Sequence, residues 1–473
     1  MGLRRTMAAA TLLAAIVLPA ATPAPAGPAV SPRPEARPDA PAGATSPGAP
    51  MVLAAAAGLA SPVVGAAVGS DTASPLASLR PPRRLGGARP SPGPETVQPA
   101  SDSGFGAWAA GFRGRALAAG IRPEVFDAAF ASVRPDPEVI RRDRNQSEFT
   151  KALWDYLDTA VSDERVRNGR DALRRHGPLL QAIEDRWGVE KEVVAAVWGL
   201  ESAYGSYRGD MDVIQSLATL AYDSRRGRFF EGQLLAALRI IQAGDVHPRA
   251  MRGSWAGAMG HTQFIPTSYL DYAVDANGDG RRDIWAEDPT DALASTAAYL
   301  ARFGWTRGQP WGVEVALPRG FDYAQARRDL KRLPSEWARA GVVGVDGRAV
   351  PDHGRASVLL PAGARGAAFL VFDNFAVIER YNTADAYVIG VGHLSDRLRG
   401  EGPIRSGWPR GDRALTYPER QELQQRLTAA GFDTRGVDGK IGPRTIEAVR
   451  AYQRALGLAP DGYASLDVLS RLR

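Results

Sequence analysis

The chain has 473 residues, enough for more than one domain, but its 51 glycines, 35 prolines and alanine-rich tracts indicate that part of it does not fold. It has no cysteine, which excludes disulfides, thiol nucleophiles, thiolate metal sites and a lipid-modified cysteine. A formal net charge of +6 permits an anionic partner, either nucleic acid or an acidic cell-wall polymer. Because the chain has no zinc-finger spacing, no aromatic RNA-binding signature and no basic helical arm, we expect no nucleic-acid partner.

The N-terminus has the three parts of a signal peptide, which we place at residues 1–26. A short basic start is followed by an apolar run and by the small residues Ala24-Pro25-Ala26. The protein is therefore expected to be exported, to the periplasm or cell envelope, and to be monomeric. We expect it to be soluble or only loosely associated with the membrane.

Residues 27–103 consist mainly of Pro, Ala, Gly and Ser, the composition of a disordered linker. Within them, the stretch from Met51 to Gly69 is long and uncharged enough for a transmembrane helix, but it is mostly Ala, Val and Gly and carries Pro62. The low-complexity interpretation is favoured. A start at Met51 stays open as an alternative.

Residues 104–399 predict one large, mainly α-helical domain of α+β type. Apolar residues at helical spacing predict helices at 105–115, 122–132, 148–158, 162–176, 190–203, 212–222, 228–243 and 291–303. A glycine-rich turn occupies 253–266, and strand character at 357–360 and 368–372 adds a minor β component.

A linker at 400–412 precedes a small domain at 413–473, for which three helices are predicted. The helices are expected at 418–430, 443–456 and 465–472, with a core of Leu423, Leu427, Ile446, Val449, Tyr452, Leu466 and Leu469. Asp438-Gly439 and Asp461-Gly462 are similar turns before two of these helices, which indicates an internal repeat. A helical bundle without a ligand stays open.

Glu201 is the only carboxylate in the apolar run from Val193 to Gly205. It lies seven residues after Val194, so a helix directs it out of the same stripe that faces the core. Burial there raises a carboxyl pKa, and a carboxylic acid that stays protonated near neutral pH is what a glycosidase uses to protonate a leaving oxygen. The alternative is a structural glutamate tied to backbone or to an arginine.

Three separated motifs give the chain a resemblance to the lytic murein transglycosylases of the membrane-bound type B family. They are the segment Gly199–Gly205, the turn Ser254–Pro266, and Arg380-Tyr381-Asn382 with Tyr387 five residues beyond the asparagine. The resemblance implies a lysozyme-like catalytic domain. Residues 415–472 resemble a three-helix peptidoglycan-binding domain.

The resemblance implies cleavage of the β-1,4 bond between N-acetylmuramic acid and N-acetylglucosamine. Glu201 would protonate the glycosidic oxygen and then accept the proton of the muramic 6-hydroxyl, which closes onto C1 and leaves a 1,6-anhydromuramoyl end. Ser254 and Asn382 would hydrogen-bond near Glu201. Gln263, Tyr299, Tyr381 and Tyr387 would line the sugar subsites. As alternatives, Ser254 is a helix cap, Gln263 and Asn382 are turn residues, and the tyrosines are core aromatics.

Residues 275–283 contain the start of a calcium-loop pattern, although the chemistry itself needs no cofactor. Asp275, Asn277 and Asp279 hold positions 1, 3 and 5, and Arg281 holds position 7, which the pattern fills with a backbone carbonyl. Position 12 is Ala286, and the family resemblance implies closure by a later acid, Asp291 in preference to Glu287 or Asp288. We expect structural calcium or sodium here, with an Asp/Gly-rich surface turn as the alternative.

Two rival functions stay open. One is a hydrolytic muramidase, which needs a second carboxylate, and the other is a non-catalytic peptidoglycan-binding scaffold in which Glu201 is structural. Zinc peptidase and serine hydrolase chemistry are disfavoured because the chain has neither a His-Glu-x-x-His nor a Gly-x-Ser-x-Gly motif.

Overall fold

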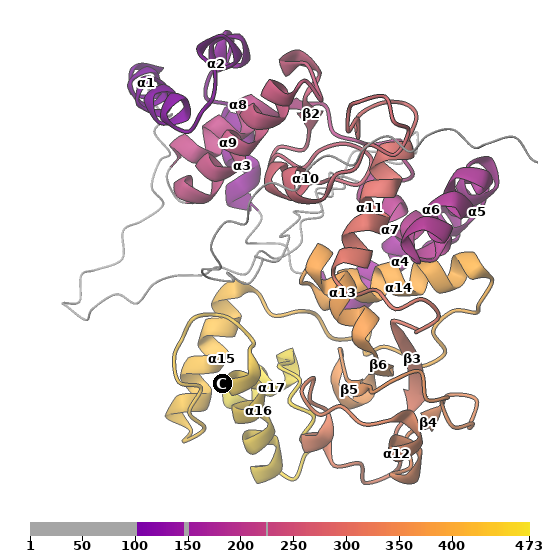
Figure 1. Ribbon diagram of the computed structural model, residues 1–473. Coiled ribbons are helices and arrows are strands. Elements are labelled where there is room, and N and C mark those ends of the chain that lie inside the picture. The colour runs from indigo at the N-terminus through magenta and orange to yellow at the C-terminus, as the bar shows by residue number, and fades with distance from the viewer. Residues whose placement is uncertain (1–101, 146–150, 224–225) are drawn as a thin grey trace, which may run out of the picture. The chain divides into compact units, whose positions relative to one another are not determined.

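The computed structural model describes residues 102–145, 151–223 and 226–473 (Figure 1). The predicted signal peptide and nearly all of the predicted linker, including Met51–Gly69, lie outside the described residues. Within the described ranges, no helix is both long enough and apolar enough to cross a membrane.

Helices make up most of residues 102–399. They are α1 (Asp102–Ala118), α2 (Pro123–Phe130), α3 (Pro137–Asn145), α4 (Leu153–Ala160), α5 (Asp163–Arg175), α6 (Gly177–Trp187), α7 (Lys191–Ser202), α8 (Val213–Tyr222), α9 (Gly227–Ala243), α10 (Pro266–Tyr272), α11 (Thr290–Arg302), α12 (Pro334–Arg339), α13 (Asp373–Tyr381) and α14 (Asp385–Arg399). The strands are β1 (Met211–Asp212), β2 (Arg252–Gly253), β3 (Gly312–Ala316), β4 (Val343–Gly344), β5 (Ser357–Leu359) and β6 (Ala368–Val371).

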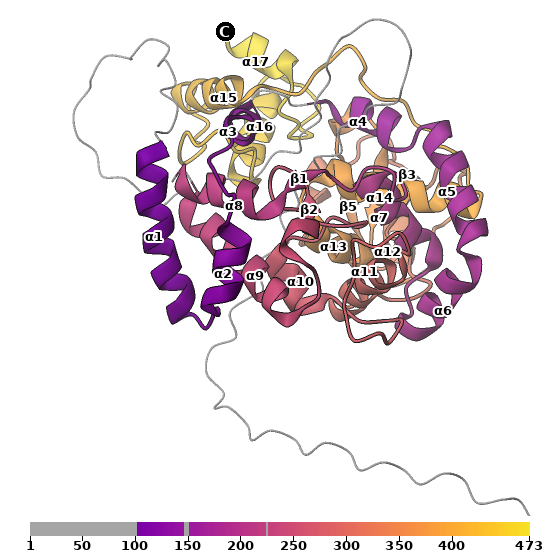
Figure 2. The same cartoon turned by 90° about the horizontal axis from the view of Figure 1, so that it is seen from above.

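Helix α7 lies at the centre of the helical core. Its residues from Val193 to Ser202 are all buried, because the helix is apolar on almost every side and packs against α14, α5, α6 and α11 (Figure 2). It ends where Ala203 and Tyr204 take left-handed backbone angles, φ 49° and 59°. Gly205 follows at φ 85°, and a Cβ there would lie 2.6 Å from His261 Nδ1. The chain therefore turns sharply just after Glu201.

The main sheet has four antiparallel strands in the order β4-β3-β6-β5. Gly312 pairs with Val371 and Val315 with Ala368, so β3 and β6 form its centre. A second apolar core packs around this sheet, including Val315, Trp337 and Leu370. Strands β1 and β2 form a separate two-stranded pair beside the glycine-rich turn.

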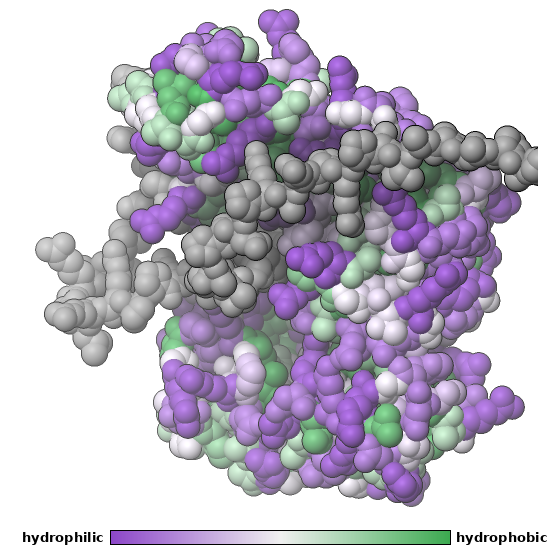
Figure 3. Space-filling model, viewed as in Figure 1, coloured by the Kyte–Doolittle hydropathy of each residue, from purple (hydrophilic) through white to green (hydrophobic). Residues whose placement is uncertain are grey.

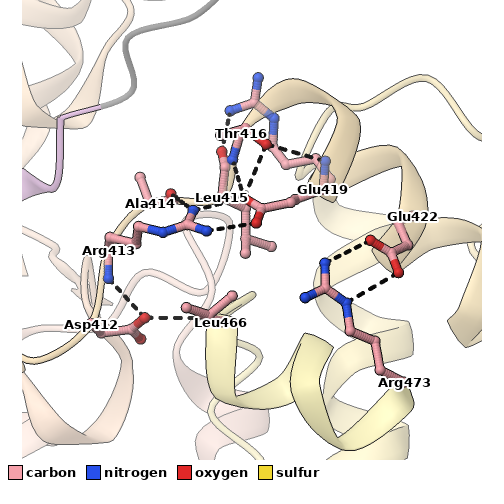
Figure 4. Close-up of polar contacts among 10 residues, drawn as sticks. Asp412, Arg413, Ala414, Leu415, Thr416, Glu419, Glu422, Leu466 and Arg473 are labelled. Carbon is pink, nitrogen blue, oxygen red and sulfur yellow. Dashed lines mark hydrogen bonds and ion pairs between the residues drawn. The ribbon is translucent and has the colours of Figure 1, made fainter.

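The C-terminal helices are α15 (Tyr417–Ala429), α16 (Pro443–Ala455) and α17 (Leu466–Leu472). Thr416 and Glu419 cap α15 reciprocally, and Arg413 and Arg473 form ion pairs with Glu419 and Glu422 on that helix (Figure 4). These contacts fix the ends of a bundle whose small core includes Leu423, Leu427 and Val449.

The two Asp-Gly turns are held by the same side-chain clasp. The amide of Gln424 donates to Asp438 at 2.9 Å and accepts from Gly439 N at 2.7 Å. Gln453 makes the equivalent bonds to Asp461 at 2.7 Å and to Gly462 N at 2.8 Å. The predicted internal repeat therefore extends to buried hydrogen bonds.

The structure confirms the mainly helical class, and most predicted helices agree with it to within a few residues. The prediction for 148–158 was wrong in its bounds: α4 begins only at Leu153, because Ala152 has extended backbone angles, and residues 146–150 lie outside the described part. The sequence analysis missed the helices α3, α6, α10, α12, α13 and α14 and the strands β1, β2, β3 and β4. Helices α13 and α14 matter most because they carry Tyr381 and Tyr387.

Candidate active site

Glu201 is buried in the last turn of α7, with only 2% of its surface exposed. Its Oε1 accepts a hydrogen bond from the Tyr387 hydroxyl at 2.6 Å, and its Oε2 has no partner among the described residues. Burial raises the pKa of Glu201 to about 8, and the Tyr387 hydrogen bond opposes that rise. The negative end of the helix dipole also disfavours the anion. The acid is therefore protonated near neutral pH, and among the described residues it is bonded to neither backbone nor arginine.

Three tyrosines surround this acid. The rings of Tyr381 and Tyr387 stack at 6.4 Å between centroids, and both side chains are almost fully buried. The phenol of Tyr156, on α4, is close enough for burial and the charge of Glu201 to raise its pKa. Gly390 makes room for it, because a Cβ there would lie 3.0 Å from the Tyr156 ring and 3.3 Å from Leu200. The sequence analysis missed Tyr156, since its position in a predicted amphipathic helix gave no sign of this approach.

The glycine-rich turn forms a compact hairpin in front of α7. Met259 and Phe264 exchange backbone hydrogen bonds of 2.9 and 3.0 Å. Gln263 sits at the tip with φ 55°, a strained conformation for a residue with a side chain, and its amide donates to the carbonyls of Arg208 and Gly260. Ser254 Oγ accepts from Ala258 N at 3.0 Å, so the hydrogen bond of Ser254 lies within the turn and not at Glu201.

Two side chains of α7 hold this turn in place. Ser202 Oγ donates to the His261 carbonyl at 2.5 Å, and Trp198 Nε1 donates to His261 Nδ1 at 3.1 Å. Because Nδ1 is an acceptor there, the ring proton belongs on Nε2, which lies 2.7 Å from the Ala286 carbonyl. Burial lowers the pKa of His261 and keeps the ring neutral. The sequence analysis assigned no role to Trp198 or His261.

Helix α13 contacts the turn from the other side. The Tyr381 hydroxyl donates to the Thr262 carbonyl at 2.6 Å, and the Tyr299 hydroxyl donates to the Arg380 carbonyl at 2.7 Å. Asn382 ends α13, and its side-chain oxygen accepts from Ala384 N at 3.0 Å. Tyr299 and Tyr381 are thus buried, and their hydroxyls already have hydrogen-bond partners. This geometry agrees equally well with a structural role in the wall of the site and with contact to a sugar.

Arg165 is a buried cation at the end of α7. Its Nη1 donates to the Gly199 carbonyl, while its Nε has no partner among the described residues. Burial lowers the pKa of Arg165, although a guanidinium stays charged at neutral pH. A positive charge here complements the carbonyl end of the helix that carries Glu201.

The predicted ion-binding loop is closed by Asp291. Both oxygens of Asp291 reach back into the loop, Oδ1 to Ala276 N at 2.9 Å and Oδ2 to Asp283 N at 2.8 Å. Glu287 instead pairs with Arg208, and Asp288 caps the start of α11 through Thr290 N. Among the three acids considered from the sequence, the structure therefore brings only Asp291 to the loop.

The other predicted ligands bond to loop amides. Asp275 accepts from Gly278 N and Gly280 N, Asn277 from Asp279 N, and Asp279 from Arg281 N. In the described part of the chain, no three His, Cys, Asp or Glu side chains are grouped so that they could hold a metal ion. The donor set is all oxygen, which is the kind that calcium prefers.

Comparison with known families identifies the fold. The family model of the transglycosylase SLT domain matches residues 104–396, more than half of the chain. The chain belongs to the SLT transglycosylase family. A second model, that of a putative peptidoglycan binding domain, matches residues 416–472.

Several relatives of this SLT transglycosylase are known. It is 32% identical over 250 residues to the membrane-bound lytic murein transglycosylase B of Escherichia coli K12, an alignment of 51% of this chain and 66% of that protein. It superposes with a TM-score of 0.76 on SltB3 from Pseudomonas aeruginosa in complex with NAG-anhNAM-pentapeptide, at 50% identity, over 78% of this chain and 99% of that one. For Escherichia coli Slt35 in complex with calcium, the TM-score is 0.54 at 28% identity, over 62% of this chain and 92% of that one.

These comparisons confirm three predictions for the SLT transglycosylase: its family, its mainly helical lysozyme-like fold, and its class as a peptidoglycan lytic transglycosylase. The roles assigned to individual site residues stay predictions. Geometry brings Glu201, Tyr381 and Tyr387 together directly, and Gln263 and Tyr299 through the turn and α13.

Proposed function

We propose that this protein cleaves the MurNAc–GlcNAc β-1,4 bond of peptidoglycan and leaves 1,6-anhydromuramic ends. The observation that carries the proposal is the buried, singly bonded Glu201, whose pKa of about 8 keeps it protonated at neutral pH. A relative with 50% identity is a protein crystallised with NAG-anhNAM-pentapeptide, which contains the anhydro product group.

Glu201 acts first as an acid and then as a base. The unpartnered Oε2 is the oxygen that donates a proton to the glycosidic oxygen, as the bond to C1 of the muramic residue breaks. The Tyr387 hydroxyl on Oε1 stabilises the carboxylate that remains. That carboxylate accepts the proton of the muramic 6-hydroxyl, whose oxygen bonds to C1. The acid is restored and no water is consumed.

A hydrolytic muramidase would need a second carboxylate across the sugar. Burial is the main cause of the raised pKa of Glu201, and no second carboxylate among the described residues contributes to the shift. A close second carboxylate would raise that pKa further by like-charge repulsion. The intramolecular route, which needs one acid, therefore fits this environment better than hydrolysis does.

The remaining predicted site residues receive these roles in the proposal. Tyr387 supports Glu201, and Tyr381, Tyr299 and Gln263 shape the subsites by fixing the turn. Ser254 and Asn382, which each make a hydrogen bond within their own turns, are proposed to contact the substrate near Glu201. Tyr156 is added to this set as a neighbour of Glu201, because burial and the charge of Glu201 raise the pKa of its phenol.

Calcium or sodium is proposed as a structural ion at residues 275–291. Asp275, Asn277, Asp279 and Asp291 would supply side-chain oxygens, and Arg281 a backbone carbonyl. Residues 275–291 include Ala286, whose carbonyl contacts His261. An ion bound there would therefore stiffen the wall of the site without taking part in the chemistry.

The C-terminal domain, residues 413–473, is proposed to hold the enzyme on peptidoglycan, and residues 104–399 to cleave it. Because peptidoglycan lies in the cell envelope, we propose that the protein acts there. We propose that the signal peptide at 1–26 directs its export to the periplasm and that it acts as a monomer. A basic chain favours contact with an acidic wall polymer.

The test is the product spectrum from purified sacculi, for the wild type beside Glu201→Gln. Anhydro ends from the wild type and none from Glu201→Gln support the proposal. Reducing ends alone would establish the muramidase, and the absence of any cleavage by a folded, sacculus-binding wild type would establish the scaffold.

A further inference from the structure

A cavity of about 810 Å³ lies away from Glu201, at the seam between the helical core and the core of the sheet. Its walls are residues 305–314, the turn 344–351, the second half of α14 and residues 401–405. No residue of the active site described above lines it. Ligands bind preferentially in such hollows between packed units.

His393 lines this cavity and is 8% exposed. Within the described residues, its imidazole makes no hydrogen bond and no ion pair. Burial lowers the pKa of His393 to about 4, so at pH 7 the ring is neutral and offers one N–H donor and one acceptor. A ligand with a hydroxyl, which both donates and accepts, would complement it.

Two indoles form apolar surface in the same cavity. The N–H of Trp305 donates to Glu190 at 2.7 Å, and that of Trp311 donates to Asp396 at 2.8 Å. Trp311 is also wedged against α14, where a Cβ on Gly392 would lie 2.3 Å from its ring. The ring positions are therefore fixed before any ligand arrives, so little conformational entropy is lost on binding.

The charges around the cavity disfavour an anionic ligand. The lining has five carboxylates, Glu190, Glu314, Asp346, Asp396 and Glu401, and three guanidiniums, Arg348, Arg399 and Arg405. Like charge disfavours a phosphate or carboxylate there.

The same carboxylates are poor sites for an amine, because their oxygens already accept hydrogen bonds. Glu314 binds the amides of Arg405 and Ser406, and Glu190 binds Trp305 and the Gly308 amide. Asp396 binds Trp311 and Arg399. A neutral ligand rich in hydroxyls, with C–H faces that pack on indole, fits this lining best.

We propose that the cavity is a second saccharide site, which binds a segment of glycan through its N-acetylglucosamine units. The inference rests on the proposed function, because that function supplies the glycan. Of the two sugars in the glycan, N-acetylglucosamine suits this lining, because it carries no carboxylate or peptide. A strand held here and at the Glu201 site is bound at two points, which raises the effective concentration of the second contact.

The chain has five histidines, so histidine Cε1–H signals report on the two sites separately. Full-length Glu201→Gln, labelled with ¹³C at histidine, is titrated with tri-N-acetylchitotriose. We expect a saturable shift of the His393 signal. The signal of His247, an exposed residue outside the cavity, should not move. His261, behind the cleft, reports binding at the active site.

Trp305→Phe in the same background should weaken the His393 titration at least threefold and leave the His261 titration unchanged. His393→Gln should slow the lysis of sacculi without changing the product type, whereas the matched His247→Gln should not. A His393 signal that stays fixed with the trimer, or that moves with cadaverine and not with the trimer, overturns the proposal. Anhydro products formed by a wild type whose His393 does not respond would refute this inference alone. A responding His393 without anhydro products would refute the proposed function alone.

Discussion

Replacing Tyr387 by phenylalanine removes one hydroxyl from Glu201 and nothing else from its surroundings. The bond is 2.6 Å long and both partners are buried. Hydrogen bonds to charged groups contribute about 1.5–3 kcal/mol. Since 1.36 kcal/mol corresponds to one pKa unit, loss of the bond should raise the pKa of Glu201 by about 1–2 units.

The assay is the pH dependence of kcat/KM on a soluble muropeptide. Its basic limb reports loss of the proton from Glu201 in the free enzyme, so Tyr387→Phe should move that limb upward by about 1–2 units. Below it the rate should fall about 10- to 150-fold, because the nascent carboxylate loses the same ~1.5–3 kcal/mol of stabilisation.

Tyr269→Phe is the matched control. Its hydroxyl donates to the carbonyl of Arg282, away from any carboxylate in the cleft, so the pH profile should keep its position. A basic limb of Tyr387→Phe that stays in place or moves to lower pH would refute the assignment of Glu201 as the titrating acid.

The remaining predictions concern stability and support of the site. Because the folded-state pKa of Glu201 is about 8 against an ordinary 4.5, its contribution to stability is complete below pH 4.5 and is lost as pH rises through 8, by up to about 5 kcal/mol. Urea unfolding measures the difference in free energy of unfolding between Glu201→Gln and the wild type, and this difference should favour the variant more at pH 8.5 than at pH 5. An equal difference at the two pH values would contradict the burial of an acid at this position. His261→Asn should lower kcat at least tenfold with a smaller change in KM, because the turn loses Trp198 and Ala286 as anchors; an unchanged kcat would show that the turn holds without it. Chelation by EGTA should lower the melting temperature of the wild type and leave that of Asp291→Asn unaffected, and equal responses would exclude calcium at this loop. Gln453→Ala should destabilise the C-terminal bundle by about 1–3 kcal/mol, since it leaves the buried Gly462 amide without its acceptor; exposed Arg454→Ala should not, and thermal unfolding measures the difference.

The periodicity of apolar residues predicted the helices that have one buried face and one polar face. Helices α5, α9 and α16 have this form, and their bounds were close. Helix α14 was missed because its middle, from Tyr387 to Ser395, is buried on every side and contains two glycines. Such a segment has no polar face whose period could be read.

The position of Glu201 on an apolar stripe predicted its burial and the direction of its pKa shift. Its partner could not be predicted in this way, because the Tyr387 bond joins residues 186 positions apart. Family resemblance supplied Tyr387. The contact of His261 with α7 spans 59 positions, depends on left-handed turns at both ends, and was found only in the folded structure.

The surface view adds that the described face of the molecule in Figure 3 is largely hydrophilic, with apolar residues in scattered patches. Single exposed apolar residues are ordinary on soluble domains.

The central claim, an acid that closes the muramic 6-hydroxyl onto C1 without water, is tested most directly by digesting sacculi in water labelled with oxygen-18. The account predicts 1,6-anhydromuramoyl ends that carry no label, formed by the wild type and not by Glu201→Gln. Reducing ends that carry the label would contradict it.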